Sequence, residues 1–159
     1  MECKVEGCGQ KTAGQSKYCK VHRAESRKRF KEMVAQQAVE REERNGKFEE
    51  LWKQACEAGR MAAEAAKPKM VRAVDELSGQ VYDPFPVCGF SWIKIRPANC
   101  AFANWLKKMG LARNSYNGGV EISIADYNQS YDLKYAHASA AAKILQEVGI
   151  KAYADGRLD

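Results

Sequence analysis

The chain has 159 residues, of which 45% are apolar and 29% are charged, and its formal net charge at pH 7 is +6. This composition is typical of a globular protein with one or two small domains, and no run of 18 apolar residues predicts a membrane span. The N-terminus has no apolar signal-peptide core. Six cysteines without such a segment favour metal binding over disulfides. We therefore expect a cytoplasmic protein with no membrane partner.

The first 22 residues contain a set of metal-ligand residues with the spacing C-x4-C-x10-C-x2-H, namely Cys3, Cys8, Cys19 and His22. Three thiolates and one imidazole are a common donor set for a closed, tetrahedral Zn²⁺ site. A segment this short cannot bury enough surface to fold alone, whereas a bound metal can supply the missing free energy. The alternative is that the cysteines are incidental or form one disulfide. The histidine two residues after the last cysteine favours structural zinc.

The excess positive charge gathers near this motif. Residues 1–31 carry nine Lys and Arg against three Glu, and a helix is predicted from Ser16 or Cys19 to about Asn45. A localised basic cluster is typical of proteins that bind the phosphate backbone, although a solvated helix face would look similar. The candidate nucleic-acid-binding residues are Lys11, Lys17, Lys20, Arg23, Arg27, Lys28, Arg29 and Lys31.

Apolar residues recur at helical spacing on both sides of Asn45-Gly46. Phe30, Met33 and Val34 lie in phase with a later stripe that includes Phe48, and Phe48 is five helical turns beyond Phe30. The pattern fits one long central helix with a weak point, or a helical hairpin that turns at Asn-Gly. Small residues in the later stripe would admit a second helix, so we expect a spacer or a homodimer formed through these helices, as in a coiled coil. These small residues are Ala55, Gly59, Ala62 and Ala63.

Turn and breaker residues divide the rest of the chain. Pro68 ends the helical pattern, and Met70 to Leu77 is expected to form another short helix. Ser78-Gly79 and the two prolines at 84 and 86 then mark a boundary. The predicted parts are a zinc knuckle over 1–22, a helical spacer or assembly segment over 23–79 and an α+β domain over 80–159.

The C-terminal part alternates between strand and helix patterns. Strands are expected at 90–95, 111–116, 120–125 and 150–154, and helices at 97–109 and 133–148. The order is β-α-β-β-α-β, the ferredoxin-like arrangement, in which two helices cover one face of the sheet. The fold class expected for the whole chain is therefore α+β.

Strand alternation predicts what lies on the open face of that sheet. If the isoleucines of the first strand point into the core, Phe90, Trp92 and Lys94 point outward, and Tyr153 joins them from the last strand. Aromatic rings with basic neighbours can stack single-stranded nucleic acid. Such a face is also often covered by another segment or by a partner subunit. These four residues form a second candidate surface.

The sequence contains only weak indications of an enzyme active site. His137 lies near Tyr131 and Asp132, but a lone histidine on an alanine-rich helix is usually a packed or surface residue. The three cysteines outside the motif are expected to be small buried residues; they are Cys56, Cys88 and Cys100. No phosphate loop or GxGxxG fingerprint is present, so we expect no enzymatic activity. An enzymatic alternative requires Asp126, Asp132 and His137 to converge in a pocket.

Two stretches resemble bacteriophage proteins. The pattern Cys-x-x-x-Gly-Cys … Tyr-Cys-x-x-His-Arg near the N-terminus is similar to the small zinc knuckles of phage HNH nucleases and other phage DNA-associated proteins. The segments 89–97, 102–108, 116–120 and 149–157 resemble a widespread family of small bacteriophage proteins. The resemblance implies a phage origin and a bacterial host cytoplasm. With His22 assigned to zinc, only His137 remains, so the catalytic set of those nucleases cannot be assembled.

These patterns favour a phage-type, zinc-containing accessory protein that binds nucleic acid, with DNA favoured over RNA, and has no catalytic role. The alternative is an inhibitor or adaptor that binds a host enzyme or defence complex and aids host takeover. In that case the helices and the aromatic sheet face would form the interface, with Trp52, Phe90 and Trp92 as its anchors.

Overall fold

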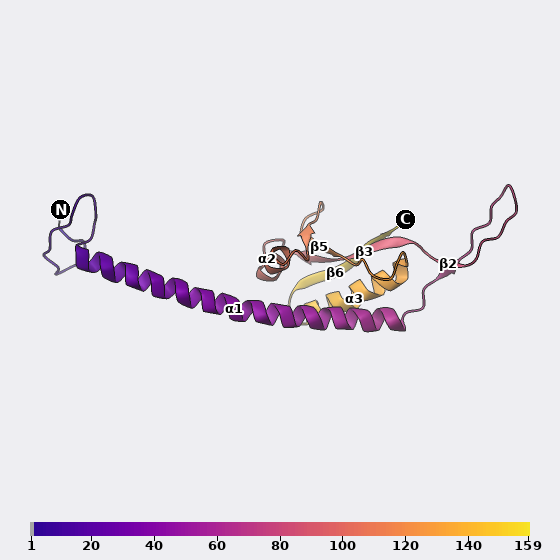
Figure 1. Cartoon of the computed structure of the whole chain (residues 1–159), viewed down its shortest axis with the longest axis horizontal. Helices are drawn as coiled ribbons and strands as arrows, with labels where there is room; N and C mark the ends of the chain where they lie inside the picture. Colours follow the sequence, from indigo (N-terminus) through magenta and orange to yellow (C-terminus); the bar gives the residue numbers. More distant parts are fainter. Residues whose placement is uncertain (1) are drawn as a thin grey trace. The chain divides into compact units, whose positions relative to one another are not determined.

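Across residues 2–159, the computed structural model contains three helices and two antiparallel sheets, so the expected α+β class is confirmed (Figure 1). The chain forms two compact units, residues 1–46 and 47–159. Their boundary lies inside helix α1 (Lys20–Ala65), and thus inside the segment 23–79 that the sequence pattern groups together.

Helix α1 continues through Asn45 and Gly46, so the helical-hairpin alternative is wrong. An interior glycine costs a helix only about 1 kcal/mol relative to alanine. The neighbouring residues are mainly Glu, Arg, Lys and Ala, which are strong helix formers. The local preference of Asn-Gly for a turn is therefore overridden by the residues that flank it.

The larger sheet contains β3 (Gly89–Arg96), β4 (Arg113–Asn114), β5 (Val120–Ser123) and β6 (Lys151–Leu158). Its spatial order is β4-β5-β3-β6, and each neighbouring pair is antiparallel. Helix α2 (Ala101–Lys108) follows β3, and α3 (Tyr131–Glu147) follows β5. Strand β3 is central because it pairs with β6 along its whole length and with β5 over Trp92–Ile95.

Side chains on the inner face of this sheet form the core of residues 47–159. Ile93, Ile95 and Val120 are fully buried, and Ile122 and Ala152 are nearly so. Residues of α2 and α3 complete the core, including Phe102, Leu106, Ala138, Ala141 and Leu145. The strand alternation expected from the sequence is confirmed by this burial pattern.

The second half of α1 packs onto the same core. The Phe48 ring lies edge-on to Phe102, with 5.3 Å between the ring centroids, and 6.1 Å from the centroid of Trp105. Ala55, Gly59 and Ala63 are buried, and the backbone of Gly59 lies against the His137 ring of α3. The small residues therefore admit a helix of the same chain, and this face is not free for a second copy.

Residues 67–88 form an arm, not the short helix expected over Met70 to Leu77. Strand β1 (Met70–Val71) pairs with β2 (Phe85–Pro86), and Val74 bridges to Val81 (Figure 1). At the tip, the Asp75 carboxylate accepts hydrogen bonds from the backbone N–H groups of Leu77 and Ser78, and Gly79 adopts a φ of +70°. Side-chain capping and a left-handed glycine stabilise a turn at the expense of a helix.

Candidate metal centre and basic helix face

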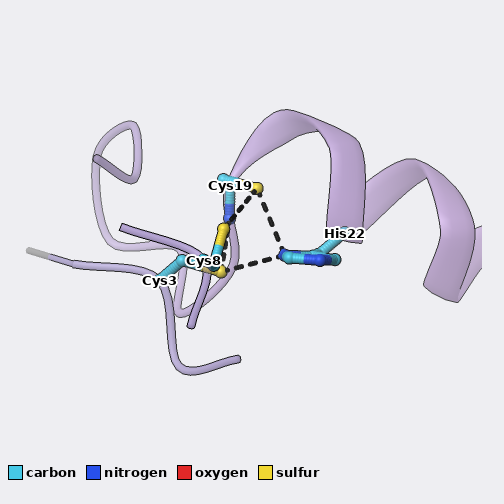
Figure 2. A group of neighbouring side chains, drawn as sticks. All are labelled: Cys3, Cys8, Cys19 and His22. Atoms are coloured by element: carbon cyan, nitrogen blue, oxygen red, sulfur yellow. Dashed lines mark hydrogen bonds between the residues drawn. The ribbon is translucent and has the colours of Figure 1, made fainter. Parts of the chain in front are cut away.

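The four predicted metal ligands converge at the N-terminal end of α1. Figure 2 shows the side chains of Cys3, Cys8, Cys19 and His22 pointing toward one another. Their ligand atoms all lie within 4.8 Å of one another. All six cysteines of the chain are free thiols. The cluster could therefore hold a metal ion through four protein ligands.

Local backbone structure brings the ligands together. Cys8 lies between Gly7 and Gly9, whose φ angles of +78° and +57° are readily adopted only by glycine. The Cys3 N–H donates to the Gln10 carbonyl, and the Cys19 N–H donates to the Cys3 sulfur. Cys19 directly precedes α1, and its carbonyl accepts from the Arg23 N–H. His22 then comes from the first helical turn, so the cluster is attached to the helix.

The surroundings shift the pKa values of the Cys3 and Cys8 thiols in opposite directions. Hydrogen bonds from the backbone N–H groups of Val5 and Cys19 lower the pKa of Cys3 to about 6. At Cys8 the Gln10 N–H favours the thiolate, but desolvation and the neighbouring cysteine sulfurs raise the pKa above its usual value. Because metals bind thiolates, a cation would relieve this repulsion between sulfurs.

The basic residues beside the cluster are all exposed. Within the described part of the chain, only one of the eight predicted phosphate contacts has a carboxylate partner: Lys28 lies 4.0 Å from Glu32. Lys20, Arg23, Arg27 and Lys31 follow one another at spacings of three or four residues in α1. Residues at these spacings share one face of a helix. We call these four residues the basic stripe; it is about 16 Å long at 1.5 Å per residue.

The second candidate surface is present in part. Phe90 is 44% exposed, Tyr153 is 37% exposed and Trp92 is half-buried. Lys94 is only 4% exposed, because its ammonium group lies 3.1 Å from the Asp155 carboxylate of the adjacent strand. Burial opposes ionisation of Asp155, but hydrogen bonds from Lys94 and the Gly156 N–H hold the pKa of Asp155 below its usual range. Lys94 is thus a paired, buried residue and not a free contact.

Several basic residues lie on the same side of the sheet as Phe90 and Trp92, and the sequence patterns do not predict them as site residues. Arg96, Arg113, Lys151 and Arg157 come to the face through cross-strand pairing. Residues directly opposite each other in an antiparallel pair point to the same side. The alternation within each strand indicates the side of each residue, but which cations meet which rings depends on the register between strands.

The acid–base candidates Asp132 and His137 have different hydrogen-bond partners. The Asp132 carboxylate accepts a hydrogen bond from the Lys69 backbone N–H, whereas Nδ1 of His137 is 2.8 Å from the Tyr127 hydroxyl. His137 is 5% exposed, and burial lowers its pKa, although the Asp126 carboxylate opposes this. Outside the metal cluster, Cys56, Cys88 and Cys100 are each half-buried.

No family model, curated protein or solved structure matches this chain. Within residues 2–159, no helix is both long enough and apolar enough to span a membrane.

Proposed function

We propose that Cys3, Cys8, Cys19 and His22 bind one Zn²⁺ ion. A regular tetrahedral zinc site would separate two sulfurs by about 3.8 Å, and a sulfur from a nitrogen by about 3.6 Å. Cys8 Sγ and Cys19 Sγ are 3.7 Å apart, and His22 Nδ1 lies 3.3 Å from Cys3 Sγ and 3.4 Å from Cys19 Sγ. Three of the six separations between ligand atoms are thus close to those of a zinc site, which supports the proposal.

A zinc ion with four protein ligands has no open coordination position for a substrate. Its proposed role is structural: it would hold residues 2–19 against the first turn of α1. This supports a non-catalytic protein, because the only other histidine is buried against Gly59 and bonded to Tyr127.

We propose that the zinc-anchored basic stripe binds the phosphate backbone of nucleic acid, with DNA favoured over RNA. The observation that carries this proposal is that His22 and the stripe share the first turns of one helix. Lys20, Arg23, Arg27 and Lys31 have no carboxylate partner within residues 2–159. Unpaired cations on a fixed face can release counterions from phosphates on binding.

The test has two measurements. Zinc content is determined on the purified protein, and duplex DNA binding is followed by fluorescence anisotropy at several salt concentrations. The logarithm of the binding constant should fall against the logarithm of salt with a slope of about −0.9 per phosphate neutralised. Replacing Arg27 and Lys31 together by Gln should therefore make the slope shallower by about 1.8.

Two controls sharpen this test. Arg41→Gln with Arg44→Gln removes two exposed cations from the same helix beyond the stripe, and should leave the slope nearly unchanged. Cys19→Ser should lose both zinc and binding, whereas Cys100→Ser should keep both. If the zinc-loaded protein binds neither duplex nor single-stranded nucleic acid at low salt, the proposal is wrong.

We also propose that residues 89–158 form a ferredoxin-like unit, supported by their chain order and by the spatial order β4-β5-β3-β6. The phage origin and the bacterial cytoplasm stay predictions that rest on sequence resemblance. A solved crystal structure of residues 47–159 within the full chain would test the strand order directly.

A second candidate function, a protein-binding adaptor, is favoured by the arm. It carries a run of exposed apolar residues that do not belong to the described core, namely Met70, Val74, Leu77, Val81, Tyr82 and Phe85. Trp52, an expected anchor, packs against the core instead. If the adaptor function holds, a host protein captured from nuclease-treated bacterial lysate should be lost with Leu77→Asp and kept with Arg27→Gln.

A further inference from the structure

The outer face of the larger sheet gathers cations around aromatic rings. Pairing of β3 with β6 places Phe90 opposite Arg157, Lys94 opposite Tyr153 and Arg96 opposite Lys151. Pairing of β4 with β5 adds Arg113 opposite Glu121. We call this set, with Trp92 and Asp155, the open face; all its members belong to the unit 47–159.

Positive charge is in excess on the open face. Its two carboxylates are each paired with one cation: Asp155 with Lys94 at 3.1 Å, and Glu121 with Arg113 at 2.8 Å. The remaining cations, Arg96, Lys151 and Arg157, form no ion pair within residues 2–159. Three unneutralised charges on one side of a small sheet favour a polyanionic ligand.

Two of these free cations lie over exposed rings. The Arg157 guanidinium carbon is 5.2 Å from the centroid of Phe90, and that of Arg96 is 5.9 Å from the centroid of Tyr153. Beside Phe90 and β5 there is a hollow of about 360 Å³, whose lining includes Phe90, Trp92, Arg113, Glu121, Ser123 and Arg157. Two aromatic rings, Phe90 and Trp92, and one free cation, Arg157, thus border this hollow.

We propose that the open face binds single-stranded nucleic acid, with bases stacking on Phe90 and Trp92 and phosphates contacting Arg157 and its neighbours. Bases stack on aromatic side chains whatever their sequence, and basic side chains follow the backbone. A duplex hides the faces of its bases, so the rings select for a single strand. The inference rests on the proposed nucleic-acid function for its ligand class, but it uses none of the residues of the basic stripe.

An acidic peptide is a weaker fit to the same face. It would satisfy Arg96, Lys151 and Arg157, but it would leave the hollow beside Phe90 and Trp92 without a planar group. The open face is therefore assigned to a ligand that supplies both rings and negative charge.

The experiment uses the full-length zinc-loaded protein, a labelled oligothymidine of 12 nucleotides and a blunt duplex of the same length. Phe90→Ala and Arg157→Gln are the test variants, and Phe85→Ala is the matched control because Phe85 is exposed on the arm instead. Each test variant should weaken oligothymidine binding at least about fivefold, with little change for the duplex. Phe85→Ala should bind both ligands as the parent does.

Tryptophan fluorescence gives a readout that affinity alone does not. Trp105 is buried and Trp52 packs on the core, whereas Trp92 lines the hollow. Oligothymidine should quench the fluorescence of the parent, and Trp92→Phe should remove that quenching.

Three results would overturn the inference. One is unchanged oligothymidine binding in both test variants, another is quenching that survives Trp92→Phe, and a third is displacement of the oligonucleotide by polyglutamate at equal charge concentration. The basic stripe is judged separately: Arg27→Gln with Lys31→Gln should weaken duplex binding whether or not the open face binds a strand.

Discussion

Gly59 lies where the backbone of α1 meets the imidazole of His137. A Cβ atom at Gly59 would fall 2.4 Å from Cδ2 of His137, well inside van der Waals contact. The ring cannot move freely, because it is 5% exposed and bonded to the Tyr127 hydroxyl. Glycine is therefore required here by close packing between helices, although glycine is intrinsically unfavourable within a helix.

We expect Gly59→Ala to lower the free energy of unfolding by about 1–3 kcal/mol, the usual cost of overpacking a core. Urea denaturation followed by circular dichroism measures this. Gly46→Ala is the matched control: it lies in the same helix, and its added Cβ meets nothing within 4 Å. It should keep or raise stability, by about 0.5–1 kcal/mol at most. Equal effects of the two substitutions would argue against the contact with His137.

The same histidine makes stability depend on pH. Burial lowers the pKa of His137 despite Asp126, and the nearby Arg60 acts in the same direction as burial. As pH falls below the unfolded-state value of about 6.5, the unfolded chain binds a proton before the folded chain does. The contribution of the neutral ring to stability is therefore complete above that pH and declines below it.

We predict that the free energy of unfolding falls between pH 7 and pH 5, and that His137→Gln reduces this fall. Urea denaturation at each pH gives the slope of the unfolding free energy against pH for the parent and for His137→Gln. The difference between the two slopes isolates the histidine from other titrating groups. Tyr127→Phe, which keeps the imidazole but removes its hydroxyl partner, serves as a second variant. A slope in His137→Gln equal to that of the parent would show that the ring does not titrate on unfolding.

At the scale of elements, the two halves of α1 have different supports. Phe48, Leu51 and Trp52 pack against the core, and Ala55, Gly59 and Ala63 are buried. Nearly every residue from Lys20 to Gly46 is exposed. Most helical stability in proteins comes from tertiary packing, so we expect the first half to depend on its proposed metal anchor, while the second half is stabilised by its packing against the core.

Removal of the proposed metal ion should therefore act locally. With a strong chelator, or in Cys19→Ser, we expect faster amide hydrogen exchange over residues 2–46 and unchanged protection in β3, α3 and β6. Cys100→Ser is the matched control, because Cys100 caps α2 through its sulfur and serine is also a good cap. Loss of protection throughout the chain on chelation would mean that the two units do not fold independently.

Local sequence patterns predict most of these helices and strands, but they do not predict contacts that depend on tertiary structure. Strand alternation predicts the inner face of β3, because Ile93 and Ile95 are two residues apart and point to the same side. The spacing of the cysteines and the histidine predicts the metal-ligand cluster. The apolar pattern over Met70 to Leu77 wrongly predicts a helix, because the turn that replaces it depends on hydrogen bonds to the Asp75 side chain. Strand alternation does not predict the burial of Lys94, because Asp155 is 61 residues away in sequence and becomes its neighbour only through strand pairing.

At the scale of the whole molecule, two basic surfaces lie in different units and have different chemistry. The stripe of α1 presents four cations at helical spacing beside one exposed ring, that of Phe30, and the cations suit a phosphate backbone. The open face combines cations with Phe90, Trp92 and Tyr153, which suits exposed bases. Because one chain carries both, a nucleic acid with a duplex part and a single-stranded part could engage both surfaces at once.

Such linkage makes the second contact intramolecular and raises affinity without any new contact. We predict that a duplex with a single-stranded tail of 12 thymidines binds at least about tenfold more tightly than the blunt duplex or the free oligothymidine. Anisotropy titrations of all three ligands at one salt concentration measure the gain. Phe90→Ala should lower the affinity for the tailed duplex to that for the blunt one, and Arg27→Gln with Lys31→Gln should lower it to that for the free strand. If the tail does not raise the affinity of the parent protein, the two surfaces do not bind one ligand. The proposal that the two units bind different parts of one nucleic acid is then wrong.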